Sequence, residues 1–394
     1  MSISSPSFRE VLSQRVIVAD GAMGTMLQAQ DPTLDDFHGH EGCNEVLNVT
    51  RPDIVRGVHD AYFAVGVDCV ETNTFGANLA ALGEYDIADR VYEYSEAGAR
   101  IARESADRWA TPDQPRFVLG SMGPGTKLPT LGHLPYASLR DAYRDNAAGL
   151  IAGGADALII ETCQDLLQVK AAVIGAKRAA EASGRDIPII AQVTIETNGA
   201  MLLGSEIGAA LTAIEPLGVD IIGLNCATGP AEMSEHLRYL ARHSRLKLSC
   251  MPNAGLPVLT ADGAHYPLTA AELADAHGSF TRDYGLSLVG GCCGTTPSTC
   301  ARWSSGCAAT SRSSAAPAPS RAPPRSTRPS RSARTPPTWP SASAATPTAP
   351  RPSARPCWRA AGTTASRRPA TRPATAPTCS TCASTTWAAT AWPT

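Results

Sequence analysis

The sequence predicts an α/β fold, a (β/α)8 barrel formed by residues 1–297. Eight short apolar runs recur between residues 16 and 294, and helical patterns lie between them. Each run begins continuously apolar, as parallel strands buried on both faces do. A barrel of this kind takes about 250 residues, which this stretch supplies. The alternative is a doubly wound open sheet, but its G-x-G-x-x-G fingerprint does not follow the first run, where Gly21-Ala-Met-Gly24 stands.

The predicted strands and helices alternate along the chain. We expect strands at 16–21, 69–74, 117–123, 157–163, 187–194, 220–226, 247–255 and 286–294. We expect helices at 51–65, 90–109, 139–153, 165–182 and 231–243, among others. Pro52 near the start of the first of these helices and Asp165 before the fourth are ordinary helix-start signals. No large-apolar helical pattern follows the eighth strand, so we expect the eighth helix to be lost.

The formal charge of −2 averages two unlike parts of the 394-residue chain. Residues 1–297 contain 21 basic and 36 acidic side chains, whereas residues 298–394 contain 13 Arg and no acidic residue. The second part also lacks Leu, Ile, Val, Met, Phe and Tyr, so it cannot bury enough apolar surface to fold. We therefore predict one barrel domain, residues 1–297, and a disordered low-complexity tail, residues 298–394. The acidic first part argues against nucleic acid as its partner.

The tail uses only eight amino acids: Ser, Thr, Cys, Ala, Arg, Trp, Gly and Pro. Every codon for these eight has G or C in its middle position, and no other amino acid is encoded that way. A GC-rich gene read in a shifted frame yields this alphabet, so we interpret the tail as a frameshift product. Restoring one nucleotide after Pro297 allows a helical pattern of Leu and Val. The alternatives are a Pro/Ala-rich linker or a basic nucleic-acid arm, and neither explains the absence of Leu, Lys, Gln and Asp.

The sequence also indicates where in the cell the protein is located. A membrane span needs about 18 consecutive apolar residues, and no such run occurs. Residues 1–10 are polar and lack the apolar core of a signal peptide. Seven of the 12 cysteines lie before residue 298, and in a protein that is not exported they are more often metal ligands or catalytic groups than disulfides. We therefore expect a cytoplasmic protein with no membrane partner.

Polar side chains end most of the predicted strands, and in a closed barrel these ends converge on one mouth. They are Asp20, Glu71, Ser121, Glu161, Gln192, Asn225, Cys226, Asn253, Cys292 and Cys293. The three cysteines end the sixth and eighth strands. Three thiolates would hold Zn²⁺ and leave one tetrahedral position open, as catalytic zinc sites do. The alternative is that these small side chains merely pack.

Asp20 and Glu161 form a candidate carboxylate pair. They suit the binding of a substrate ammonium or acid–base chemistry. The alternative is a buried cap or ion pair, and the residue pattern does not decide between the two.

Several motifs together resemble the homocysteine S-methyltransferases. They are DGAMGTML at 20–27, GCNE at 42–45, ETNTFG at 71–76, GSMGP at 120–124, Asn225-Cys226 and GGCCG at 290–294. The resemblance covers residues 12–297 without a gap. Within the family, the DGAMGTML start and the stretch GCNEVLNVTRPDIV are most similar to the homocysteine-binding modules of cobalamin-dependent methionine synthases.

The resemblance implies a site and a reaction. It implies Zn²⁺ held by Cys226, Cys292 and Cys293, with the thiol of L-homocysteine as fourth ligand. Asp20 and Glu161 would bind the substrate ammonium, and the backbone of the turn that includes Gly21, Gly24 and Thr25 would bind its carboxylate. Asn225 belongs to the same substrate site.

The resemblance also implies a methyl donor. This is methylcobalamin, free or on a cobalamin-carrying domain, with 5-methyltetrahydrofolate as the ultimate source. Two alternatives stay open: a cobalamin-independent methyltransferase that uses S-methylmethionine or betaine, and a non-catalytic protein that binds zinc or homocysteine.

Overall fold

The computed structural model describes residues 6–260 and 263–307, and its centre is one eight-stranded parallel sheet. The strands are β1 (Ile17–Val18), β2 (Cys69–Glu71), β3 (Phe117–Met122), β4 (Ala157–Cys163), β5 (Ile189–Val193), β6 (Ile221–Asn225), β7 (Lys247–Met251) and β10 (Leu286–Val289). Their order is β1-β10-β7-β6-β5-β4-β3-β2. A parallel bridge between Ala19 and Cys69 joins the two end strands, so the sheet closes into a barrel. All eight predicted strands are present, although most end earlier than predicted, the eighth at Val289 rather than at residue 294.

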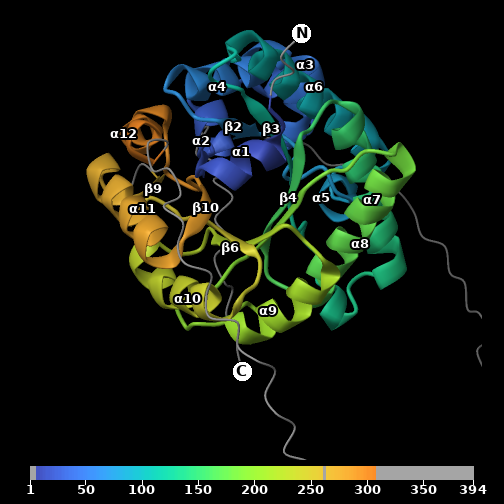
Figure 1. Ribbon diagram of the computed structural model, residues 1–394. Coiled ribbons are helices and arrows are strands. Elements are labelled where there is room, and N and C mark those ends of the chain that lie inside the picture. The colour runs from blue at the N-terminus through green and yellow to red at the C-terminus, as the bar shows by residue number, and fades with distance from the viewer. Residues whose placement is uncertain (1–5, 261–262, 308–394) are drawn as a thin grey trace, which may run out of the picture. The chain divides into compact units, whose positions relative to one another are not determined.

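Helices alternate with these strands and surround them as an outer ring (Figure 1). The α-helices are α1 (Phe8–Gln14), α2 (Met23–Gln28), α3 (Leu47–Thr50), α4 (Pro52–Ala64), α5 (Leu79–Gly83), α6 (Val91–Trp109), α7 (Tyr136–Ala152), α8 (Leu166–Ser183), α9 (Ile207–Ile214), α10 (Pro230–His243), α11 (Ala270–Tyr284) and α12 (Pro297–Cys307). Short 3-10 helices occupy Leu34–Phe37, Asn44–Val46, Ala88–Arg90, Pro129–Leu131 and Glu215–Leu217. The five helices predicted by range are confirmed to within three residues at each end.

Alternate residues of each strand enter two different cores, because side chains in a strand point to opposite faces. Ala19, Cys69, Leu119 and Ile159 belong to the cluster that fills the barrel interior. Phe8, Val11 and Leu12 of α1 join that interior cluster. Since α1 precedes β1, it covers the end of the barrel opposite the mouth. The intervening residues, such as Val18 and Val70, belong to the larger cluster between strands and outer helices.

The expectation that the eighth helix is lost is wrong. Helix α12 begins at Pro297, extends to Cys307 across the predicted domain boundary, and lies beside α11 (Figure 1). Cys300 is 0 % exposed and Trp303 is 1 % exposed. The Trp303 ring meets the His277 ring with centroids 4.8 Å apart. Buried residues at positions i, i+3 and i+4 are enough to give a helix a face that packs against the core. A single Trp buries much of the area that Leu and Val side chains would otherwise bury.

The connection between β7 and α11 contains a hairpin that the sequence did not predict. Strand β7 ends at Met251, and β8 (Val258–Thr260) pairs antiparallel with β9 (Gly263–His265). The predicted seventh strand therefore extended too far, to residue 255. The connection belongs to the βα loops, which in this fold line the mouth.

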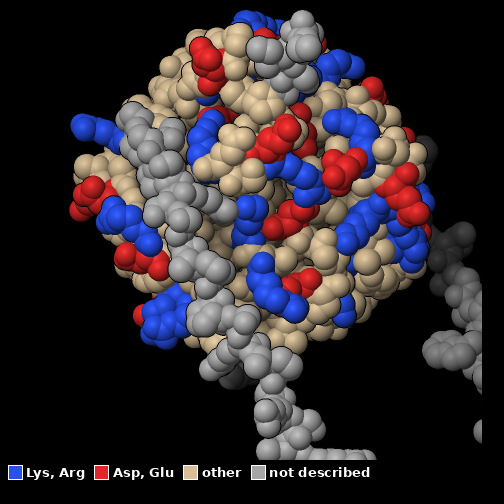
Figure 2. Space-filling view, in the orientation of Figure 1, with Lys and Arg blue, Asp and Glu red and all other residues tan. Residues whose placement is uncertain are grey.

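Two further observations concern the surface. On the face seen in Figure 2, Lys and Arg side chains are interspersed with Asp and Glu. Among the described helices, none combines the length and the apolar character needed to cross a bilayer. The predicted tail beyond residue 307 lies outside the described residues.

Candidate metal centre and carboxylate cluster

The structure brings Cys226, Cys292 and Cys293 together at the barrel mouth. Cys226 directly follows β6, and the other two follow β10 after Gly290 and Gly291. Only β7 lies between β6 and β10 in the sheet. The three sulfur atoms all lie within 4.8 Å of one another. The Sγ atoms of Cys226 and Cys293 are 4.0 Å apart.

An unusual backbone supports this convergence. Cys226 has φ +59° and Ala227 has φ +57°, a left-handed conformation that residues with a side chain seldom adopt. Such strain persists where the surrounding structure enforces it, often at functional sites. A Cβ atom at Gly291 would lie 2.3 Å from Cγ2 of Thr295. Glycine at this position therefore allows the close approach that turns Cys292 and Cys293 to the mouth.

The three thiols form an electrostatically asymmetric cluster. Hydrogen bonds from Cys226 and Cys292 lower the pKa of Cys293 to about 3. Hydrogen bonds to Cys226 and Cys293 raise the pKa of Cys292 well above its usual range. The neighbouring thiols therefore favour the thiolate form of Cys293. A soft divalent cation would stabilise all three as thiolates, and thiolate donors suit Zn²⁺.

Tyr266 is a member of the site that sequence reasoning missed. It follows β9, and its ring covers Gly294 so closely that a Cβ there would lie 2.3 Å from Cγ of Tyr266. Its side chain lies near the Cys293 sulfur and helps to lower the pKa of that thiol. Burial and the nearby Cys293 charge raise the pKa of Tyr266. Only its place in the seventh βα loop could have indicated a role in advance.

A second cluster at the mouth consists of three carboxyl groups. Asp20 follows β1, Glu71 ends β2 and Glu161 lies in β4. Asp20 is 1 % exposed and Glu161 is 6 % exposed. Oδ2 of Asp20 accepts a hydrogen bond of 3.1 Å from the backbone N–H of Glu71. Among the described residues, Oδ1 of Asp20 and Oε1 of Glu71 are buried without a hydrogen-bond partner.

These carboxyl groups are held in an unfavourable environment for negative charge. Burial raises the pKa of Asp20 and of Glu71 well above the usual range, and the neighbouring carboxylates raise both further. Burial raises the pKa of Glu161 to about 7. Since no Lys or Arg is among the causes of these shifts, the cluster is short of positive charge.

Asn225 links the two clusters. Its Nδ2 lies 3.4 Å from Oε2 of Glu161, and its Oδ1 accepts a 2.7 Å hydrogen bond from the backbone N–H of Thr162. The hydroxyl of Ser121 donates to Oε1 of Glu161. Asn225 immediately precedes Cys226, so the same strand end positions both a thiol and the Glu161 carboxyl.

The remaining predicted residues lie in the first βα loop. Gly21 contacts Thr295 so closely that a Cβ would lie 2.7 Å from its Cγ2. Gly24 and Thr25 belong to the first turn of α2, whose N-cap, Ala22, has no side-chain hydrogen bond. The first turn of a helix presents backbone N–H groups without intrahelical partners, which can bind an anion.

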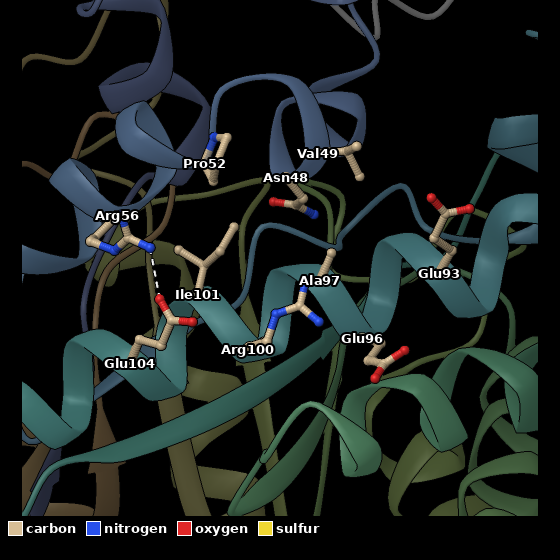
Figure 3. Close-up of a pocket in the computed structure, with 10 residues that line it drawn as sticks. All are labelled: Asn48, Val49, Pro52, Arg56, Glu93, Glu96, Ala97, Arg100, Ile101 and Glu104. Atoms are coloured by element: carbon tan, nitrogen blue, oxygen red, sulfur yellow. Dashed lines mark hydrogen bonds and ion pairs between the residues drawn. The ribbon is translucent and has the colours of Figure 1, made fainter.

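A groove on the outside of the barrel is separate from both clusters. It has a volume of about 390 Å³ and lies between the α3–α4 segment and α6 (Figure 3). Val49, Ala97 and Ile101 contribute apolar surface, and Arg56 pairs with Glu104 at 2.7 Å. None of the mouth residues described above lines this groove.

The fold and the thiol cluster define a class: a parallel (β/α)8 barrel with three convergent cysteines at its mouth. Residues 17–305 match the family model for homocysteine S-methyltransferases, so the chain belongs to the homocysteine S-methyltransferase family. The resemblance seen in the motifs is thereby confirmed, and the family is one of methyltransferases.

Two curated relatives are bacterial methionine synthases. The chain is 67 % identical to that of Mycobacterium tuberculosis (strain ATCC 25618 / H37Rv) over 289 residues, which are 73 % of this chain and 24 % of the relative. It is 65 % identical to that of Mycobacterium leprae (strain TN) over 288 residues, again 73 % of this chain and 24 % of the relative. The chain thus spans about a quarter of the length of these relatives.

Solved structures share the fold. The homocysteine methyltransferase MmuM from Escherichia coli in its metallated form has a TM-score of 0.60 and 22 % identity, covering 74 % of this chain and 96 % of that one. The apo form of the same enzyme has a TM-score of 0.56 and 21 % identity, covering 74 % and 96 %.

Proposed function

We propose that this chain is the zinc-dependent homocysteine-binding half of a methionine synthase, which prepares the thiol of L-homocysteine to accept a methyl group. The observation that carries this proposal is the convergence of three thiols within 4.8 Å beside a buried carboxylate cluster. The first cluster suits a metal that binds a thiol, and the second suits an ammonium. Homocysteine carries both groups.

Cys226, Cys292 and Cys293 would hold Zn²⁺ with three sulfurs. The donor set fits, because three thiolates leave one position open for a substrate ligand. When bound, Zn²⁺ lowers the pKa of a coordinated thiol, so that a nucleophilic thiolate exists at neutral pH. Tyr266 would orient Cys293 through its hydroxyl. The thiols of the described cysteines are free, which suits the cytoplasmic location that we also propose.

Asp20 and Glu161 would bind the substrate ammonium, and Asn225 and Ser121 would hold the Glu161 carboxyl in place. The first turn of α2, with Gly24 and Thr25, would bind the substrate carboxylate through backbone N–H groups. These contacts at the far end of the substrate would fix where its sulfur lies. Correct placement of reacting atoms is itself a large contribution to rate.

The proposed methyl donor is methylcobalamin, free or on a cobalamin-carrying domain, which 5-methyltetrahydrofolate would regenerate. High identity to two methionine synthases supports this choice. S-methylmethionine or betaine remains the alternative donor. We also retain the proposal that the segment from residue 298 onward arises from a shift in reading frame, which the gene sequence around codons 297 and 298 would test.

The test is zinc-dependent demethylation of added methylcobalamin, followed by its visible absorbance. The complete chain with zinc and homocysteine should produce methionine and demethylated cobalamin, and the Cys293→Ser variant should not. Turnover with S-methylmethionine or betaine in the absence of cobalamin would favour the alternative donors. Tight zinc with four protein ligands and no response to homocysteine would mean a non-catalytic protein.

A further inference from the structure

We propose that Glu71 is a third ligand of the substrate ammonium, so that Asp20, Glu71 and Glu161 together select a primary amine. This inference rests on the proposed function, because it concerns the same substrate. Glu71 thereby gains a role in substrate specificity. Neither metal binding by the three thiols nor ammonium binding by Asp20 and Glu161 depends on that role.

The strand register places Glu71 in the barrel mouth. Cys69 belongs to the interior cluster, and side chains two positions apart in a strand share a face. Glu71 therefore points to the interior from β2. By the same rule Glu161 points to the interior from β4, two positions after the interior residue Ile159. Between them, β3 contributes Ser121, which donates to Glu161.

Asp20 approaches Glu71 from the other side. The bridge between Ala19 and Cys69 sets β1 and β2 side by side. The next contact along the chain is the hydrogen bond from the Glu71 N–H to Oδ2 of Asp20, at 3.1 Å. The backbone of Glu71 thus uses one Asp20 oxygen and leaves the other available. The three carboxyl groups therefore come from three nearby strand ends at the barrel mouth.

Two carboxyl oxygens of this cluster have no hydrogen-bond partner among the described residues. Oδ1 of Asp20 and Oε1 of Glu71 are both buried acceptors without a hydrogen-bond partner among the described residues. Burying such an atom unpaired is unfavourable. The carboxyl groups affect one another's pKa, and no basic side chain is among the causes of their shifts. The complementary group is a cation with several donors.

A primary ammonium fits this requirement. It carries a positive charge and three N–H donors, as the lysine head group does. One donor for each carboxyl group would satisfy Asp20, Glu71 and Glu161 together. A substrate without the amino group would leave three buried acidic groups unpaired, and a site that is built to hydrogen-bond a substrate group rejects an analogue that lacks it.

The experiment compares two ligands of the zinc-loaded full chain by calorimetry: L-homocysteine and its deamino analogue, 4-sulfanylbutanoic acid. The variant is Glu71→Gln, which keeps the side-chain shape and removes the charge. A hydrogen bond to a charged group contributes enough for a loss of about tenfold to a hundredfold in homocysteine affinity. Affinity for the deamino analogue should not fall. Glu181→Gln, at an exposed position of α8, is the matched control and should match the wild-type chain for both ligands.

Each outcome decides the proposal. A Glu71→Gln chain that binds both ligands as the wild type does, or loses affinity for both equally, overturns it. If Glu71→Gln lacks zinc or native circular dichroism, the same comparison is made with Glu71→Asp, which keeps the charge but withdraws it by one methylene. Selective loss for homocysteine is again expected, and an unchanged ratio again overturns the role. A wild-type chain that binds neither ligand would instead contradict the proposed function.

Discussion

The Sγ atoms of Cys226 and Cys293 lie 4.0 Å apart, although 67 positions separate the two residues in the sequence. Closure of the barrel brings them together, since only β7 separates β6 from β10. Hydrogen bonds within the cluster lower the pKa of Cys293 to about 3, which favours its thiolate form. The three soft donors are thus already close together, as a tightly bound Zn²⁺ requires.

Removing one of these thiols should abolish tight zinc binding. We expect one Zn²⁺ per chain in the wild-type protein and substoichiometric zinc in Cys293→Ser, because two sulfurs do not complete the ligand set. Zinc content after dialysis, measured by mass spectrometry, tests this. Cys43→Ser is the matched control, since Cys43 is buried but donates to Glu45 away from the cluster. Full zinc in the Cys293 variant would remove this residue from the site.

Neutralising the predicted ammonium ligands should weaken substrate binding and leave the metal in place. For Asp20→Asn and Glu161→Gln we expect homocysteine affinity to fall about tenfold to a hundredfold, the effect of one charge-assisted contact. Calorimetry on zinc-loaded protein measures the affinity, and zinc analysis is the control. Unchanged affinity in both variants would return these residues to a structural role.

The stability of the zinc-free chain should depend on pH through Glu161. Its folded pKa of about 7 exceeds the usual carboxyl value, so the folded state keeps a proton that the unfolded state releases at lower pH. Glu161 therefore reduces stability progressively as pH rises from about 4.5 to about 7. The free energy of unfolding of Glu161→Gln, relative to wild type, should rise over this range by up to roughly 3 kcal/mol.

Urea denaturation at several pH values measures this difference. The comparison with wild type is essential, because burial also lowers the pKa of His59 and His277 to about 4, and these two groups act with the opposite sign. A difference between the two proteins that does not change with pH would show that Glu161 titrates normally.

Helix α12 should contribute to stability through Trp303. Replacing this buried side chain by Ala leaves a cavity against His277, and such a change costs about 3–5 kcal/mol. Thermal or urea unfolding of Trp303→Ala measures the loss. Arg302→Ala, at an exposed position of the same helix, should change stability little. Equal stability of Trp303→Ala and wild type would mean that the barrel does not need this helix.

Local sequence patterns alone predicted the eight strands, most of their helices and the position of Asp20, Glu161 and the three cysteines at strand ends. These features are local: apolar runs, helical periodicity and the residue type that ends each run. The wrong expectation for α12 has the same origin. A search for helices by Leu and Val alone misses one in which a single Trp supplies most of the buried apolar area.

Strand register, the path of the loops and the burial of side chains could be seen only in the tertiary structure, because local sequence patterns do not contain them. Whether Glu71 faces the interior beside Asp20 depends on the register between β1 and β2, and the contact of Tyr266 with Cys293 depends on how a hairpin folds over the mouth. Likewise, the raised pKa of Glu161 arises from burial by neighbouring strands. Register, loop path and burial are set by contacts between residues far apart in the chain, and these contacts exist only once the barrel has closed.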